Sequence, residues 1–225
     1  MHASTTERLT GQIELRVALA GEGDAAARPV TRCVSTWVRA IEIGCFGPAR
    51  VRVVAIEVQG TEVRAELHCE RLSASAVDGL ARMLRHLSAT QSGPERFTLT
   101  HNGRSVAPRS EVALPDLPDV VPFAVEYPAD LTRFVRVEIE FHDVLAPGAR
   151  DAVFDALATW DVLVAAFGDE QRWSARVDLE TRLLSPRIVE HQVDGYFASF
   201  ECLHLVVLFC VRLHQRLAIE RLTLE

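Results

Sequence analysis

The second half of this chain repeats the residue pattern of the first half, in the same order and at a nearly constant spacing. Ordered self-similarity at a fixed offset is the sequence signature of a repeated structural unit. We therefore interpret the chain as a tandem duplication in which both copies fold into the same elements. The matching segments are residues 13–17 with 137–141, Thr36-Trp37 with Thr159-Trp160, 49–51 with 175–177, His68 with His191, and 95–99 with 220–224.

Each copy alternates between strand-like and helix-like segments, because the period of its apolar residues changes between two and helical spacing. Pro29 and Pro147 suit the first turn of a helix, and Ser73 is a candidate N-cap. The apolar run Leu203–Val211 has no clear period and could be a strand, but the repeat favours a helix. We expect strands at 13–20, 51–59, 62–69, 96–100, 135–141, 173–180, 186–193 and 219–225, helices at 29–44, 73–87, 147–167 and 197–213, and a turn at 101–104.

The resulting order, β-α-β-β-α-β in each copy, is that of the ferredoxin-like split βαβ fold. We therefore expect an α+β protein made of tandem duplicated ferredoxin-like repeats, with antiparallel sheets and helices on one face. The first repeat spans 1–104, a proline-rich connector spans 105–130, and the second repeat spans 131–225. Whether the repeats form separate modules or one pseudo-symmetric unit stays open.

Charge and composition exclude several classes of function. The net charge of −7 disfavours general binding to nucleic acid or to an anionic membrane. Every one of the 24 basic residues is arginine and Asn102 is the sole asparagine, which suggests a GC-rich bacterial genome. Without lysine there can be no Schiff base, no pyridoxal-phosphate anchor and no Walker-A lysine, and we expect no cofactor.

The sequence favours a cytoplasmic location. The first residues lack the apolar segment of a secretory signal, and Leu203–Val211 is about half the length of a membrane-spanning helix. The 5 cysteines form no CxxC pair and lie mostly in apolar-patterned segments, where free thiols behave as small hydrophobic side chains. We expect no membrane partner.

One face of each sheet should stay open, and strand alternation predicts which side chains lie on it. RNA-recognition sheets carry stacking aromatic side chains on that face, and none occurs at these positions, so we exclude RNA binding there. The side chains expected on the open faces are those of Glu14, Arg16, Arg64, Glu66 and His68 in the first copy, and Glu138, Glu140, His142, Arg176, Asp178 and Glu180 in the second.

Three of these residues could instead be metal ligands. Glu138, Glu140 and His142 are spaced two apart, and carboxylate and imidazole ligands suit a divalent cation. The commoner alternative is a salt-bridged face with Arg176 and Arg221 as counter-charges, and this interpretation is preferred. No HExxH or comparable spacing supports a metal.

Residues 21–26 match the pattern GxGxxA after a strand, as in a dinucleotide-binding turn. The preceding strand alternates in polarity, Glu22 and Asp24 would face a polyphosphate, and Pro29 places the expected helix start too far along the chain. We interpret the match as an ordinary loop.

His68 and His191 occupy matching positions in the two copies, so they could form an acid–base pair, or they could be surface residues of a hairpin strand. Trp37 and Trp160 fall on apolar helix faces and should be core residues.

The helix expected at 197–213 is apolar all round, whereas a helix on a two-layer fold normally has a polar outer face. We therefore expect Leu205, Leu208 and Phe209 to lie at an interface with the other repeat or with a second copy of the chain.

These observations favour a non-enzymatic protein that binds another protein, such as an immunity protein or an assembly adaptor. Its acidic surface would suit a basic partner. The alternative is a small-molecule or metal-binding enzyme or sensor with a site between the repeats, built from His68, His191, Glu140 and His142.

Overall fold

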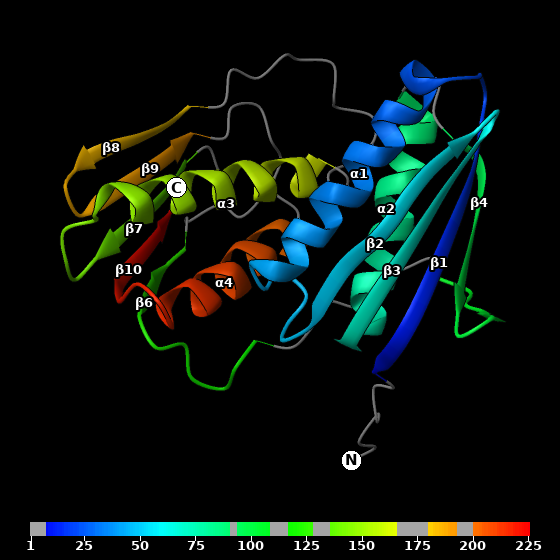
Figure 1. Cartoon of the computed structure of the whole chain (residues 1–225). Helices are drawn as coiled ribbons and strands as arrows, with labels where there is room; N and C mark the ends of the chain where they lie inside the picture. The colour runs from blue at the N-terminus through cyan, green and yellow to red at the C-terminus, as the bar shows by residue number, and fades with distance from the viewer. Residues whose placement is uncertain (1–7, 91–93, 109–116, 128–135, 166–179, 193–199) are drawn as a thin grey trace. The chain divides into compact units, whose positions relative to one another are not determined.

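The computed structural model describes residues 8–90, 94–108, 117–127, 136–165, 180–192 and 200–225. The chain divides into two compact units, Met1–Pro115 and Asp116–Glu225. Among the described residues there are four helices and two mostly antiparallel sheets, which confirms the α+β class (Figure 1).

In the first unit two helices cover one face of an antiparallel sheet whose strand order is β2-β3-β1-β4-β5 (Figure 1). Consecutive strands β2 and β3 form a hairpin, and β1 lies in the middle of the sheet between β3 and β4. The elements are β1 (Leu9–Leu19), α1 (Asp24–Glu42), β2 (Arg50–Gln59), β3 (Glu62–Leu72), α2 (Ala74–Thr90), β4 (Pro94–His101) and β5 (Arg104–Ser105).

The core of this unit follows from the alternation of β1. Ile13, Leu15 and Val17 are fully buried, and the residues between them lie on the opposite face. Trp37 of α1 is also fully buried and donates a hydrogen bond from Nε1 to the carbonyl oxygen of Ala76 in α2, at 2.7 Å. The expectation that Trp37 is a core residue is confirmed, as it is for Trp160 of the second unit.

The first helix begins earlier than the sequence predicts. α1 starts at Asp24, directly after Gly23, whose φ of 84° ends the preceding loop, and Pro29 lies inside the helix. The prediction placed Pro29 in the first turn because its missing N–H costs nothing there. The buried positions Ala27 and Val30 continue the apolar face across the proline, so packing outweighs the lost hydrogen bond.

The chain's one asparagine stabilises a turn and the strand beside it. Asn102 (φ 49°) and Gly103 (φ 76°) form the expected turn between β4 and β5. The Asn102 Oδ1 atom accepts a hydrogen bond from the backbone N–H of Gln12 at 3.0 Å. Gly11 makes this approach possible, because a Cβ there would lie 2.6 Å from that oxygen.

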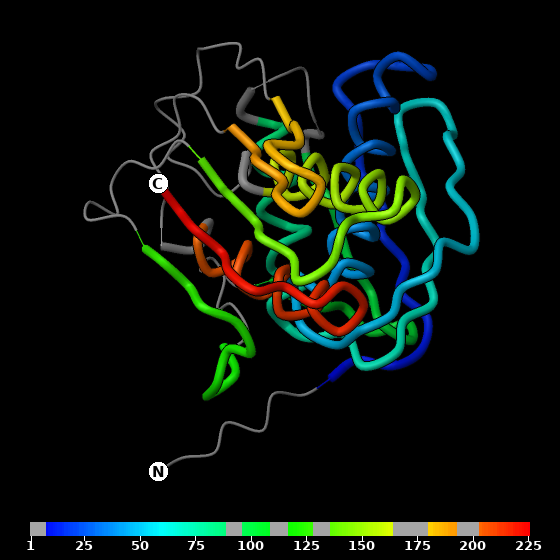
Figure 2. Tube along the Cα trace, turned by 90° about the vertical axis from the view of Figure 1, so that its left-hand side faces the viewer, coloured from blue at the N-terminus to red at the C-terminus, as the bar shows by residue number. Residues whose placement is uncertain are grey.

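The second unit contains a sheet of strand order β6-β10-β7-β9-β8, in which only the β6–β10 pair is parallel. Figure 2 shows β10 (red) between β6 (green) and β7 (yellow-green). The helix α4 packs against β10 and against α3. The elements are β6 (Ala124–Glu126), β7 (Arg136–Phe141), α3 (Pro147–Ala165), β8 (Thr181–Ser185), β9 (Ile188–Gln192), α4 (Phe200–His214) and β10 (Ile219–Leu224).

Two strands of this sheet differ from the prediction. The sequence predicted a strand at 173–180, of which 173–179 lie outside the described residues. It did not predict β8, which a tight turn at Pro186-Arg187 joins directly to β9. It also treated residues 105–130 as connector, whereas β6 from this segment forms an edge of the sheet.

The apolar run 203–211 is helical, as the repeat indicated. Leu205, Leu208 and Phe209 are all buried, and their role at an interface stays a prediction. No helix in the described part of the chain has the length and apolar character needed to cross a membrane.

Candidate functional site

The face of the second sheet opposite its buried residues carries an ordered array of charged side chains. Along β7, Val137, Ile139 and Phe141 are buried, and the alternate residues Glu138 and Glu140 lie on the other face, as the sequence predicts. Side chains from β8, β9 and β10 join them in rows across the sheet, because residues opposite one another on paired strands share a face.

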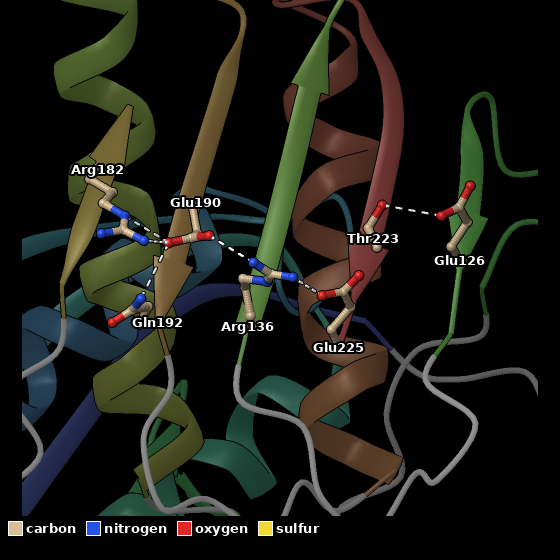
Figure 3. Close-up of polar contacts among 7 residues, drawn as sticks. All are labelled: Glu126, Arg136, Arg182, Glu190, Gln192, Thr223 and Glu225. Carbon is tan, nitrogen blue, oxygen red and sulfur yellow. Dashed lines mark hydrogen bonds and ion pairs between the residues drawn. The ribbon is translucent and has the colours of Figure 1, made fainter. Parts of the chain in front are cut away.

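Glu190 of β9 is the centre of this array (Figure 3). Its side chain is 1% exposed although it lies on the open face. Arg182 of β8 donates from Nε at 2.8 Å and from a terminal nitrogen at 2.7 Å, and Arg136 of β7 donates at 3.2 Å from the other side. Gln192 adds a further hydrogen bond at 3.3 Å. The guanidinium groups that flank the carboxylate thus pair with it and cover it.

The array extends from Glu190 towards the parallel edge of the sheet (Figure 3). Arg136 also pairs with Glu225, which follows β10. Thr223 of β10 donates a hydrogen bond to Glu126 of β6 at 3.5 Å. The ion pairs from Arg182 through Glu190 and Arg136 to Glu225 are therefore continuous across the sheet, and the Thr223–Glu126 contact is separate from them.

A second group of ion pairs surrounds Glu140. Its carboxylate lies 3.4 Å from Arg187 and 3.4 Å from Arg221, and Arg221 also contacts Glu126 at 3.2 Å. This is the salt-bridged face that the sequence favoured over a metal site, with Arg187 in addition to the expected Arg221.

The three alternative metal ligands are not brought together. Glu140 is held by arginines, and His142 lies beyond the end of β7, with Nδ1 3.9 Å from Glu220. The Glu138 side chain forms no ion pair or hydrogen bond with the described residues. Within the described ranges no group of three or more histidine, cysteine or acidic residues is placed to hold a metal ion. Arg176 and Asp178 lie outside those ranges, and Glu180 is exposed ahead of β8.

His191 faces the opposite, buried side of this sheet. Its side chain is 1% exposed, and its Nε2 lies 2.8 Å from the Asp161 carboxylate of α3. The Thr181 hydroxyl lies 2.7 Å from Nδ1, and the Trp160 ring meets the imidazole edge to face. Hydroxyl, imidazole and carboxylate therefore lie in a row between sheet and helix, with a hydrogen bond between Thr181 and His191 and an ion-pair contact between His191 and Asp161.

Burial raises the pKa of the Asp161 carboxyl above its ordinary value, because the charged form loses its hydration, while His191 opposes the shift. The second carboxylate oxygen, Oδ1, has no hydrogen-bond partner among the described residues. A buried charged carboxylate with one unpartnered oxygen is therefore costly at this position.

The predicted equivalence of His68 and His191 is wrong by one residue. His68 pairs with Gln12 and is exposed on the open face of the first sheet. His191 pairs with Val137, which the sequence comparison matched with Ile13. Ile13 itself pairs with Leu67 and not with His68. A shift of one position along a strand reverses the face on which a side chain lies, so the histidines are not structural equivalents.

The open face of the first sheet is also ion-paired. Glu14 lies 2.8 Å from Arg16 and 2.7 Å from Arg64, and Arg64 lies 2.9 Å from Glu66. These four residues occupy the face that the alternation predicted. All of their pairs are more exposed than the Glu190 pair.

The glycine-rich turn at 21–26 needs one correction. One argument against a dinucleotide site was a late helix start, but α1 begins directly after Gly23. The other arguments remain: β1 belongs to an antiparallel sheet, whereas dinucleotide turns follow a parallel strand, and Glu22 and Asp24 are acidic.

Sequence reasoning missed Glu190, Arg136 and Arg182, as well as the partners Asp161 and Thr181 of His191. A signal was present, because Glu190 stands in the alternating segment 188–192, but its burial depends on the register of β8, which was not predicted.

Comparison of the chain with protein-family models, with curated proteins and with solved structures finds no match.

Proposed function

We propose that this chain is a non-enzymatic, cytoplasmic protein of a GC-rich bacterium that binds another protein, in the manner of an immunity protein or an assembly adaptor. The surface that would carry this function is the charged open face of the second sheet.

We also infer that the protein is built from two ferredoxin-like repeats. Support comes from the spatial strand orders β2-β3-β1-β4 and β8-β9-β7-β10, which place corresponding elements in the same positions. The paired residues Ile13–Leu67 and Val137–His191 keep the same offset between the units. The two tryptophans lie on corresponding helices, α1 and α3.

The observation that supports protein binding is the positioning of the charges. The side chains around Glu190 are held by mutual ion pairs, so a partner that pairs with this face need not immobilise them first. Glu138 lies between Glu190 and Thr223 without a cation of its own among the described residues. An arginine or lysine of a basic partner would supply the missing charge, and long-range attraction to the acidic chain would speed association.

A pull-down with the full chain tests this proposal. Wild-type protein, Glu138→Arg and the control Glu22→Arg, which lies in an exposed loop of the first unit, are used as bait at low and high salt. We expect one stoichiometric protein partner with wild type and control, retained less at high salt and lost with Glu138→Arg. Absence of a stoichiometric partner under every condition, or equal recovery with all baits, would contradict the proposal.

A second candidate function, a small-molecule enzyme or sensor, is favoured by the chain Thr181–His191–Asp161. An imidazole held between a hydroxyl and a buried carboxylate is an arrangement that can move a proton. Thermal-shift screening of metals and metabolites tests it, because a ligand at a hundredfold excess over its dissociation constant stabilises by about 3 kcal/mol. We expect a shift for wild type that disappears in His191→Gln. No shift with any compound would remove this candidate.

A further inference from the structure

Among the described residues, the strand β2 forms a free edge of the first sheet, with β3 as its one neighbour (Figure 1, cyan). It spans Arg50–Gln59, which is long for an edge strand that is left open. Backbone N–H and C=O groups along such an edge can pair with another strand, and proteins normally shorten or cover it.

The side of β2 that faces the helix layer is apolar and incompletely covered. Val51, Val53, Ile56 and Val58 stand opposite Cys69, Leu67, Ala65 and Val63 of β3, all of which are fully buried. Val51 is buried too, but Val53 is 37% exposed and Val58 is 38% exposed. The core of the unit therefore extends to the edge strand without being closed there.

A β-bulge divides β2 into two similar halves. The register shifts between Val53 and Ala55, so Val54 is the extra residue, and it is 55% exposed. Before the bulge the sequence is Val-Arg-Val at 51–53, and after it the sequence is Ile-Glu-Val at 56–58. Because the bulge reverses the alternation, the apolar residues of both halves lie on the same face.

This pattern is complementary to itself when reversed. If β2 is laid antiparallel to a second β2 with Val53 opposite Ile56, then Val51 lies opposite Val58 on the apolar face. On the other face Arg52 lies opposite Glu57, and twofold symmetry repeats each pair. In a regular strand without the bulge, Val53 and Ile56 would lie on opposite faces, so this register could not place the two apolar pairs on one face.

Both charged groups are available for such a pairing. Arg52 is exposed and forms no ion pair with the described residues. Glu57 is also exposed, and its carboxylate accepts a single hydrogen bond, from Gln59 at 3.3 Å. Opposite charges directly across an antiparallel pair are favourable, and like charges are unfavourable.

We propose that the chain forms a homodimer in which the β2 strands of two copies pair antiparallel about the bulge, with Arg52 of each copy opposite Glu57 of the other. The two first sheets then become one continuous sheet, and the exposed valines of both copies cover one another. A strand of a different protein with the same complementarity is the alternative occupant of this edge. The proposal is independent of the function inferred for the second sheet.

Charge exchange tests the register. The mass in solution of the full chain is measured by sedimentation equilibrium from micromolar to millimolar concentration for Arg52→Glu, for Glu57→Arg and for the double variant. We expect a dimer for wild type and for the double variant, because the exchange restores both ion pairs. Each single variant creates two like-charge contacts and should weaken the dimer roughly tenfold or more.

The control is Arg104→Glu, on β5 at the opposite edge of the same sheet, which should leave the dimer unchanged. Hydrogen exchange of the β2 amides in the wild-type chain provides a second measurement that needs no variant, and it should slow as concentration rises. A wild-type monomer at millimolar concentration would overturn the proposal. So would a dimer that Arg52→Glu leaves unchanged, or β2 exchange independent of concentration.

Discussion

The ion pair between Arg182 and Glu190 should contribute much more to stability than an ordinary surface pair. The Glu190 side chain is 1% exposed and the Arg182 side chain is 46% exposed. Two nitrogens of Arg182 contact one carboxylate oxygen at 2.7 and 2.8 Å. Hydrogen bonds to charged groups contribute about 1.5–3 kcal/mol each when the acceptor is buried, and the exposure of the arginine reduces this value. We expect a coupling free energy of about 1–2 kcal/mol.

A double-mutant cycle measures this coupling. Arg182→Ala, Glu190→Ala and the double variant are unfolded in urea, and the non-additive part of the change in unfolding free energy is the coupling. The pair Arg39–Glu42 on α1 serves as a matched control, because it joins the same kinds of group at 3.3 Å with both side chains nearly half exposed. Its coupling should be about 0.5 kcal/mol or less, as for other helix-surface pairs.

Salt separates the two pairs further. Exposed ion pairs are screened at high ionic strength, whereas a covered pair is screened much less. The Arg182–Glu190 coupling should therefore persist in concentrated salt and the Arg39–Glu42 coupling should fall towards zero. Equal couplings for the two cycles would refute the argument that burial of the carboxylate determines the strength of the pair.

Three further changes test other parts of the structure. Gly11→Ala should lower the free energy of unfolding, measured in urea, by about 1–3 kcal/mol. The φ angle of Gly11 is +129°, and the new Cβ would lie 2.6 Å from the Asn102 side chain. An unchanged free energy of unfolding would disprove that contact. Burial raises the pKa of Cys33 and of Cys45 to about 12, so neither thiol should react with an alkylating reagent at about pH 8 until the chain unfolds. Labelling of either cysteine in the native protein, detected by peptide mass mapping, would contradict this. The raised pKa of Asp161 means that its ionisation is less favourable in the folded than in the unfolded state. Its contribution to stability is therefore complete below pH 3.8 and is lost as pH rises through the raised pKa. Asp161→Asn should gain stability relative to wild type as pH rises above 3.8, and a relative loss would contradict this sign.

The periodicity of the sequence was sufficient to predict most of the elements. Alternation located β1, β3 and β7 together with the faces of Glu14 and Glu140, because a strand with one buried face leaves a period of two in its own residues. The helical character of the run at 203–211 could be predicted only by comparison with the similar residue pattern in the first half of the chain.

The candidate site was much less predictable. The burial of Glu190 arises from arginines on β7 and β8, and the pairing of strands distant in sequence leaves no local pattern. The position of His191 could not be predicted either. Its match with His68 leaves the spacing between the two halves of the chain uncertain by one residue, and a change of one residue moves a side chain to the other face of a strand. The start of α1 was misplaced because Pro29 was taken as a first-turn residue, although the helix continues through it.

The position of β10 has a consequence for the order in which the protein can fold during synthesis. Every strand of the first sheet precedes the second unit in the chain, so the first unit can fold while the second is being synthesised. The second sheet cannot be completed until β10 has been translated, because β6 and β7 both pair with β10, which follows all the other strands of that sheet in the chain. Until β10 emerges, β6 has no neighbour in the described sheet and one edge of β7 is open, which makes the nascent second unit the part of this protein most in need of protection by chaperones.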